Sequence, residues 1–398
     1  MSEQAIRERM SGNEAVAEAI RQVNPDVMPA FPITPSTEIP QMVSTFIANG
    51  KVDTEFIPVE SEHSAMSAAI GSEAAGARTM TATSSAGLAL MWEELLLAAS
   101  NRLPIALTLV NRTLSGPINI NCDHSDGMGA RDTGWIQIYA ENNQEAYDNY
   151  IQAFPIAEDK RVHLPIMICQ DGFITSHAVE NISLLPDAPV KEFVGTYEPE
   201  EFLLNPGKPI AVGPYSISAY AMEAKKAQAE AMENAREVIL EVAERFEKMS
   251  GRKYGFFESY RLEDADYAMV IMGSAAGTAK QAVDELREQG MKVGILKIRV
   301  FRPFPEKEIA EALKNCKAVA IMDRTESYNG NCGPLGSEVT AGLYRNKVFL
   351  EAICYTYGLA GRDFTTDSVK GIFDQLRTLV EEKKPIPHNQ YIGLRTRK

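Results

Sequence analysis

The chain has 398 residues, about twice the upper end of the usual ~100–200 residues per domain, so two domains are expected. Its 45% apolar and 24% charged residues are ordinary for a globular protein with sizeable cores. The formal net charge of −14 argues against nucleic acid as a main partner, because phosphate binding requires a positive surface.

The N-terminal stretch and the cysteines exclude further classes of protein. The polar stretch MSEQAIRERMSGNEA lacks the apolar core of a signal peptide, and no apolar run reaches the ~18 residues of a membrane-spanning helix. We therefore expect a cytoplasmic protein without membrane contact. The five cysteines form no CxxC pair or Cys/His cluster. This pattern predicts free reduced thiols and argues against a zinc or iron–sulfur site held by this chain alone.

The first half of the sequence alternates strand and helix patterns. Strands are predicted at 27–31, 54–59, 79–83, 104–110, 135–140 and 165–170. Helices are predicted at 36–48, 62–77, 87–100 and 144–157. Strands separated by helices of this length require right-handed crossovers, so the pattern predicts an α/β domain with a parallel sheet.

Two segments then interrupt the alternation. Residues 185–210 are Pro-rich and are predicted to be irregular. Residues 218–248 are dense in Ala, Glu and Lys and predict one long helix, either an arm across a neighbouring surface or a plain solvated helix. Strand and helix patterns resume at 268–272, 278–289, 292–298, 318–322 and 348–355. We therefore place one α/β domain at 1–254 and a smaller one at 255–398.

Polar residues that follow the predicted strands are candidates for a site, because ligands of open parallel sheets bind at the carboxyl ends of the strands. Thr34 precedes Pro35 and is predicted to cap the next helix, although its hydroxyl could equally meet a small carboxylate. Glu62 is either a helix-terminal charge or an acid with a raised pKa. Ser84 and Ser85 form either a tight turn or a close backbone approach for a ligand.

Two later loops add charged candidates. Arg112 begins a long loop, 112–134, and either pairs with a carboxylate in a bidentate manner or lies at the surface. His177 is either a base or a structural histidine. No Ser/His/Asp spacing, Walker loop or GxGxxG fingerprint is present.

Ordered sequence blocks along the chain carry a resemblance to one family. They are GNEAVAEAI (12–20), FPITPSTEI (31–39), VESEHSAMSAAIGSEAAGAR (59–78), TATSSAGLAL (81–90), VNRTLSGPINI (110–120), RDTGWIQIYAENNQEAYD (131–148), DGFITSH (171–177) and VGILKIRVFRPFP (293–305). Together they resemble the alpha subunits of 2-oxoacid:ferredoxin oxidoreductases, in particular pyruvate:ferredoxin oxidoreductase (pyruvate synthase). The resemblance implies a multisubunit thiamine diphosphate enzyme that oxidatively decarboxylates pyruvate to acetyl-CoA and CO2, reversibly, with ferredoxin as electron acceptor.

The same resemblance implies a fold and a set of site residues. The first domain would be the parallel-sheet module that holds the aminopyrimidine ring, and the second a transketolase C-terminal-like α/β domain. Glu62 would bind the aminopyrimidine and promote activation of the cofactor, with Ser84 and Ser85 also assigned to cofactor binding. Thr34 and Arg112 would hold the carboxylate of the 2-oxoacid.

Missing motifs imply partner subunits. The family holds the diphosphate and its Mg²⁺ through a GDG motif that this sequence lacks, and its electrons leave through [4Fe-4S] clusters that need clustered cysteines. The cofactor is therefore expected to be shared with a partner, with Mg²⁺ and the clusters on beta, gamma and delta-type subunits. Ferredoxin, pyruvate and CoA are the other expected partners, and the resemblance leaves open whether this chain contacts CoA. The uncharged Thr34 and the short segment 115–117 favour a small substrate such as pyruvate. A branched-chain 2-oxoacid, or a non-catalytic scaffold role, are the alternatives.

Overall fold

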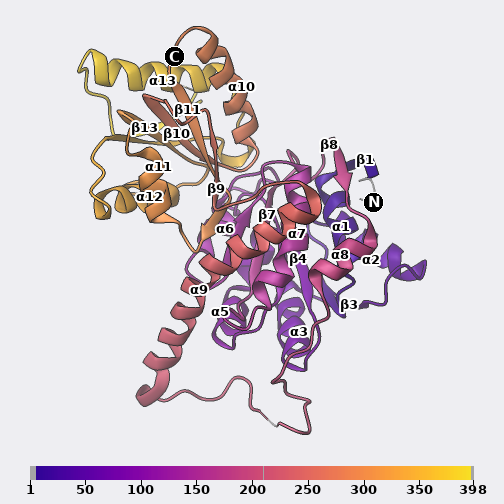
Figure 1. Ribbon diagram of the computed structural model, residues 1–398. Coiled ribbons are helices and arrows are strands. Elements are labelled where there is room, and N and C mark those ends of the chain that lie inside the picture. The colour runs from indigo at the N-terminus through magenta and orange to yellow at the C-terminus, as the bar shows by residue number, and fades with distance from the viewer. Residues whose placement is uncertain (1–5, 209, 396–398) are drawn as a thin grey trace.

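A five-stranded sheet forms the centre of the first α/β unit in the computed structural model, which describes residues 6–208 and 210–395 (Figure 1). The strand order is β12 (Val300–Arg302), β6 (Ile136–Tyr139), β7 (Ile166–Asp171), β5 (Ala106–Asn111) and β4 (Met80–Thr83). All of these except β12 are parallel. A parallel pair, β2 (Val27–Ala30) and β3 (Glu55–Pro58), extends the unit through a bridge between Val27 and Thr79. The predicted parallel-sheet α/β architecture is therefore confirmed.

Alternate residues of the central strands enter two different cores, as the pleat requires. In β5, Ala106 and Val110 belong to one core, whereas Leu107 and Leu109 belong to the other. Helices cover both faces, so β5 and β7 are buried at every position. The covering helices are α1 (Gly12–Val23) and α7 (Asn143–Ala157) on the first core, and α3 (Glu62–Ala74) and α5 (Trp92–Ser100) on the second.

A six-stranded sheet forms the second unit. Its order is β15 (Asn389–Tyr391), β14 (Glu351–Thr356), β13 (Ala318–Asp323), β10 (Tyr267–Met272), β11 (Val293–Ile298) and β9 (Phe257–Tyr260). Only β9 runs antiparallel to its neighbour among these described strands. One face is covered by α10 (Ala275–Glu288) and α13 (Thr366–Glu381), and the other by α11 (Glu306–Leu313) and α12 (Pro334–Arg345).

The two units share one continuous apolar core. Leu107 and Met167 of the first sheet belong to the same buried cluster as Val270 and Leu296 of the second. Strand β12 follows β11 of the second sheet directly in the chain, but it belongs to the first sheet, where it pairs antiparallel with β6. A domain boundary at 254/255 therefore stays a prediction, because residues beyond it complete the sheet of the first unit.

The long helix α9 (Ser218–Ser250) confirms the helix predicted at 218–248. Its C-terminal half packs on the first unit through a stripe that includes Ala235, Ile239 and Phe246. Its N-terminal end projects away from both units, where residues 218–227 are mostly exposed (Figure 1). The helix is thus packed on the first unit along its C-terminal half and exposed at its N-terminal end, and its role as an arm stays a prediction. No helix of the described residues combines the length and apolar character needed to cross a membrane.

Several local expectations were wrong. The predicted helix at 87–100 is two helices, α4 (Ser85–Leu90) and α5, which meet at Met91. The Pro-rich segment contains α8 (Asp187–Val194), whose one proline, Pro189, lies in the first turn, where proline is tolerated. The antiparallel pair β1 (Ile6–Ser11) and β8 (Val179–Leu184) was missed, since strands far apart in sequence leave no local signal of their pairing.

Candidate active site

The turn at Thr34 and the side chain of Arg112 meet beyond the carboxyl ends of β2 and β5. Arg112 is 7% exposed, and its Nη1 donates to the Thr34 carbonyl at 2.9 Å and its Nε to the Asn119 carbonyl at 3.3 Å. Its Nη2 has no hydrogen-bond partner within residues 6–208 and 210–395. A largely buried cation that meets only neutral carbonyls leaves a place for an anion.

Thr34 does not cap a helix, contrary to expectation. Helix α2 (Glu38–Ala48) begins four residues later, with Thr37 at its N-cap position. The intervening residues form a turn in which the Ser36 hydroxyl donates to the Ile33 carbonyl at 2.8 Å. Thr34 is consequently exposed, and its hydroxyl is left to meet whatever binds beside Arg112.

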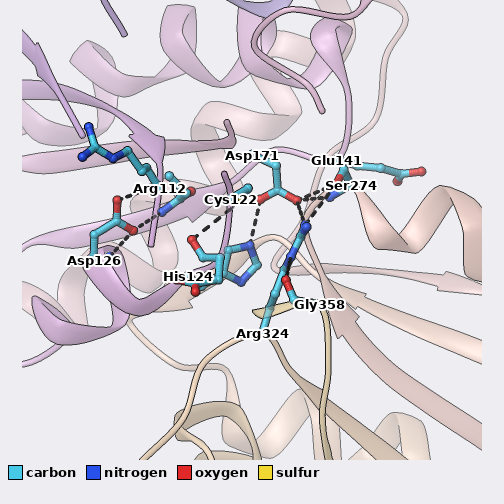
Figure 2. Close-up of polar contacts among 12 residues, drawn as sticks. Arg112, Cys122, His124, Asp126, Glu141, Asp171, Ser274, Arg324 and Gly358 are labelled. Carbon is cyan, nitrogen blue, oxygen red and sulfur yellow. Dashed lines mark hydrogen bonds and ion pairs between the residues drawn. The ribbon is translucent and has the colours of Figure 1, made fainter. Parts of the chain in front are cut away.

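Asp126 connects the loop after β4 to the loop after β5, and Figure 2 shows its contact with Arg112. It lies in the short helix α6 (Ser125–Gly129), which the long loop 112–134 contains. Its carboxylate accepts hydrogen bonds from the backbone N–H groups of Ser85 at 3.0 Å and Arg112 at 2.9 Å, and from the Asn111 amide at 2.8 Å. Burial nevertheless raises the pKa of Asp126 to about 6. Asp126 thereby fixes the two loops relative to each other.

Glu62 is the first residue of α3 and lies close to the loop after β4. Ser61 caps the helix by accepting from the Ser64 N–H, and the Glu62 side chain is buried at 7% exposure. Its Oε1 would lie 2.8 Å from a Cβ at position 87, so only glycine fits there. The Glu62 carboxylate has no hydrogen bond to the part of the chain that the structure describes. An acceptor of this kind is ready for an outside donor.

The two serines of the β4 loop behave differently. Ser85 has a backbone φ of +46°, and its hydroxyl donates to the Thr113 carbonyl at 2.6 Å, so it shapes the turn. The hydroxyls of Ser84 and Thr83 are buried without a partner among the described residues. An unsatisfied buried polar group costs about 1–3 kcal/mol, so these hydroxyls fit a bound polar group. With Glu62 and the bare backbone of Gly87, they suit a flat, nitrogen-containing ring such as an aminopyrimidine.

A second polar cluster, centred on Asp171, was missed by the sequence analysis (Figure 2). Asp171 ends β7 and is 1% exposed. Its Oδ1 lies 2.8 Å from Nε2 of His124, and its Oδ2 accepts from Nη1 of Arg324 at 2.8 Å and from the Ser274 N–H at 3.0 Å. Burial opposes ionisation, but the charges of His124 and Arg324 outweigh it and hold the pKa of Asp171 well below its usual range. A charged residue ending a buried strand was the available signal.

Possible metal-ligand groups in the described part of the chain are engaged by protein cations. The group of Cys122, His124 and Asp171 includes the carboxylate that is paired with Arg324. The group of Glu141, Glu145 and Glu258 surrounds the ammonium of Lys297, which pairs with all three carboxylates.

His177 contacts residues of its own segment after β7 and is not bonded to Glu62, Arg112 or Asp171. Its Nδ1 lies 2.8 Å from the Ser176 hydroxyl, and its ring lies against Phe173 with centroids 4.8 Å apart. These neighbours favour the structural interpretation over a role as a base.

Comparison with solved structures shows which proteins share the fold. The fold is similar to a 2-oxoglutarate:ferredoxin oxidoreductase from Magnetococcus marinus, solved with 2-oxoglutarate, coenzyme A and succinyl-CoA bound, with a TM-score of 0.68 at 18% identity over 93% of this chain. This chain covers 65% of that longer protein. It is also similar to a split-gene transketolase, an inactive beta4 tetramer, with a TM-score of 0.55 at 12% identity over 93% of this chain and 99% of that one. Both likenesses concern the fold, and they confirm the predicted α/β fold class with parallel sheets.

Sequence comparison identifies the family within that class. Residues 18–244 match the family described as pyruvate flavodoxin/ferredoxin oxidoreductase, thiamine diphosphate-binding, and residues 265–369 match pyruvate:ferredoxin oxidoreductase core domain II. Pyruvate synthase subunit PorA of Thermotoga maritima is 50% identical over 98% of both chains, and that of Methanocaldococcus jannaschii 46% over 97% of both. Ketoisovalerate oxidoreductase subunit VorA of Pyrococcus horikoshii is 44% identical over 95% of this chain and 96% of its own. The chain belongs to the pyruvate flavodoxin/ferredoxin oxidoreductase family and carries its thiamine diphosphate-binding domain.

Proposed function

We propose that this chain is the alpha subunit of a pyruvate:ferredoxin oxidoreductase. The complex would convert pyruvate and CoA to acetyl-CoA and CO2 with ferredoxin as electron acceptor, and would run in reverse as a pyruvate synthase. The observation that carries the proposal is the guanidinium of Arg112, which is largely buried and bonds only to neutral carbonyls of the described chain. The PorA relatives, 46–50% identical over nearly their whole length, point to pyruvate as the anion.

In this proposal Glu62 and Ser84 hold the aminopyrimidine of thiamine diphosphate. The bound cofactor supplies the electron sink that receives the electron pair when CO2 leaves. The Glu62 carboxyl holds a proton at a ring nitrogen, and its burial keeps water from competing for that contact. The Ser84 hydroxyl donates to or accepts from the ring, while Ser85 keeps the turn in shape.

Substrate binding would rest on Arg112 and Thr34. Arg112 supplies a fixed cation for the carboxylate of pyruvate, held in place by the Thr34 and Asn119 carbonyls. Thr34 supplies a neutral donor from the same turn, so the pocket carries one positive charge for one carboxylate. Asp126 acts as a positioning residue, because its carboxylate holds the backbone of Arg112 and of Ser85.

The rest of the active site would come from partner subunits of beta, gamma and delta type. The sequence lacks the GDG motif for the diphosphate and its Mg²⁺, and it lacks clustered cysteines for [4Fe-4S] clusters. The exposed side of the Thr34 turn is then the side on which a partner subunit closes the cofactor site.

The test is activity of the purified complex with a panel of 2-oxoacids. We expect CoA-dependent reduction of a viologen dye with pyruvate, at a higher kcat/KM than with 2-oxoisovalerate or 2-oxoglutarate, and thiamine diphosphate in the isolated complex. The VorA relative at 44% identity supports the second candidate, a branched-chain 2-oxoacid enzyme, which a preference for 2-oxoisovalerate would establish. A complex that neither contains thiamine diphosphate nor responds to it would instead favour a scaffold subunit.

A further inference from the structure

Two thiols that have no assigned role toward the cofactor or the substrate converge beside the first turn of α12. Cys332 lies on the glycine-rich turn before α12, and Cys354 lies on β14. A Cβ at position 336 would lie 2.8 Å from Sγ of Cys354 and 3.0 Å from Sγ of Cys332. The absence of a side chain at Gly336 is therefore what allows both sulfur atoms to approach the same point.

The two thiols are unequal in a way that suits stepwise oxidation. Cys332 is partly exposed, whereas Cys354 is buried at 7% exposure. The neighbouring Cys354 thiol, together with the Ser337 hydroxyl at 3.5 Å, favours the thiolate and lowers the pKa of Cys332 to about 6. Cys332 is thus the accessible thiolate, and Cys354 is the neighbouring thiol that can attack it once it is oxidised.

The remaining cysteines of the chain offer no such arrangement. Cys122, Cys169 and Cys316 are all buried, and burial raises the pKa of each, that of Cys316 to about 11. Buried thiols that stay protonated are inert toward peroxide. The pair on α12 and β14 is therefore distinct within the same molecule.

We propose that Cys332 and Cys354 are a peroxide-responsive thiol pair that closes reversibly to a disulfide. The Cys332 thiolate attacks hydrogen peroxide, the O–O bond breaks, and the products are a sulfenic acid on Cys332 and one water after proton transfer. The Cys354 thiol then attacks the Cys332 sulfur, the S–O bond breaks, and a second water leaves. One peroxide is reduced to two waters as two thiols are oxidised to one disulfide, and a dithiol reductant reverses the change.

The disulfide would restrain a wall of the cleft between the two units. Glu326, Ser327 and Tyr328 precede Cys332 and line a cavity of about 640 Å³ together with residues 113–131 of the first unit. Strand β14, which carries Cys354, lies inside the second sheet between β13 and β15, so the Cys354 end of the disulfide would be held in place by the sheet. Oxidation would therefore tether the loop 326–333 to the sheet.

The experiment uses the full-length chain purified without oxygen and treated with stoichiometric hydrogen peroxide. After alkylation of free thiols, peptide mass mapping is expected to show a Cys332–Cys354 disulfide. The amount of alkylated Cys332 should fall about tenfold, and dithiothreitol should restore it. Without peroxide, iodoacetamide labelling of Cys332 should be half-maximal near pH 6, compared with about 8.5 for an ordinary thiol. A Cys332 that stays alkylatable after peroxide treatment would overturn the proposal.

Three variants separate the steps. Cys354→Ser should trap the sulfenic acid on Cys332, which dimedone labels, and Cys332→Ser should leave Cys354 reduced. Cys316→Ser, the matched control at a buried thiol elsewhere in the same unit, should not change the yield of disulfide. Disulfides of Cys332 with several other cysteines in similar yield would show random oxidation of an unfolded chain and contradict the assignment. Circular dichroism of each variant identifies any loss of fold.

Discussion

Two polar clusters lie at the carboxyl ends of parallel strands of the first unit, and they differ in how many of their polar groups find a partner within the described chain. Around Asp171, the carboxylate is matched by His124, Arg324 and Ser274, which come from both units. Around Glu62 and Arg112, the described chain gives the Glu62 carboxylate no hydrogen-bond donor and gives the Arg112 guanidinium neutral carbonyls but no anion. The cluster around Asp171, whose polar groups are paired, joins the two units. The cluster around Glu62 and Arg112, whose polar groups are not all paired, is the better candidate for binding a ligand. Strand-end position alone does not separate the two.

The largest effect is expected for Glu62→Gln in the complex. The amide keeps the shape of the side chain but cannot hold the proton in the same way, so kcat should fall by roughly 10²–10⁴-fold while the melting temperature stays unchanged. The matched control is Glu73→Gln on the same helix. Glu73 is also buried, and burial raises its pKa to about 8, so it is already protonated near pH 7 and its amide should retain activity. Equal losses in both variants would remove Glu62 from the site.

Next in size is the effect of Asp171→Asn on stability. Removing this charge leaves the buried guanidinium of Arg324 without its partner, which should lower the free energy of unfolding by about 3–5 kcal/mol. The same substitution at Asp187, whose ion pair with Arg21 is solvent-exposed, should cost about 0–1 kcal/mol. Urea unfolding of the three proteins measures both. A stable Asp171→Asn protein with no activity would reverse the assignment of the two clusters.

The lowered pKa of Asp171 predicts how the difference in unfolding free energy between wild type and Asp171→Asn depends on pH. Its folded value lies below the unfolded value of ~3.9, so the stabilisation is fully present above pH ~4. It is lost as the pH falls through the folded pKa, where the folded carboxylate also becomes protonated. The gap in unfolding free energy between wild type and Asp171→Asn should therefore shrink as the pH falls below 4.

The sequence predicted the cluster around Glu62 and Arg112 better than the cluster around Asp171. The loops of Thr34, Glu62 and Arg112 each follow a strand with a clear local pattern, and the family resemblance singled out these residues. The link between Asp171 and Arg324 depends on the packing of two sheets, which no local pattern encodes. The same reason hides the transfer of β12 to the first sheet and the pairing of β1 with β8. The roles of Glu62, Ser84, Ser85, Thr34 and Arg112 in cofactor and substrate binding stay predictions.

A smaller effect is expected for Arg112→Lys. Lysine keeps the charge but loses the planar fork that bonds the Thr34 and Asn119 carbonyls, so the charge is no longer fixed in place. Loss of one charge-assisted hydrogen bond, about 1.5–3 kcal/mol, should lower kcat/KM for pyruvate about 10–100-fold, mainly through KM. Arg112→Gln, which removes the charge, should lose more. If Lys and Gln variants lost equally, the geometry of the guanidinium rather than its charge would determine binding.

The smallest effect is expected for Thr34→Val, which replaces an exposed hydroxyl by a methyl group of similar size. A neutral hydrogen bond contributes about 0.5–1.5 kcal/mol, so KM for pyruvate should rise about two- to tenfold at nearly constant kcat. Stability should not change, because this hydroxyl does not cap α2 and the turn is held through the Thr34 carbonyl. Thr34→Ser, which keeps the hydroxyl, should behave as wild type. Equal losses in the Val and Ser variants would show that the shape of the side chain matters and not its hydroxyl, and Thr34 would then contribute to the site only through the carbonyl that holds Arg112.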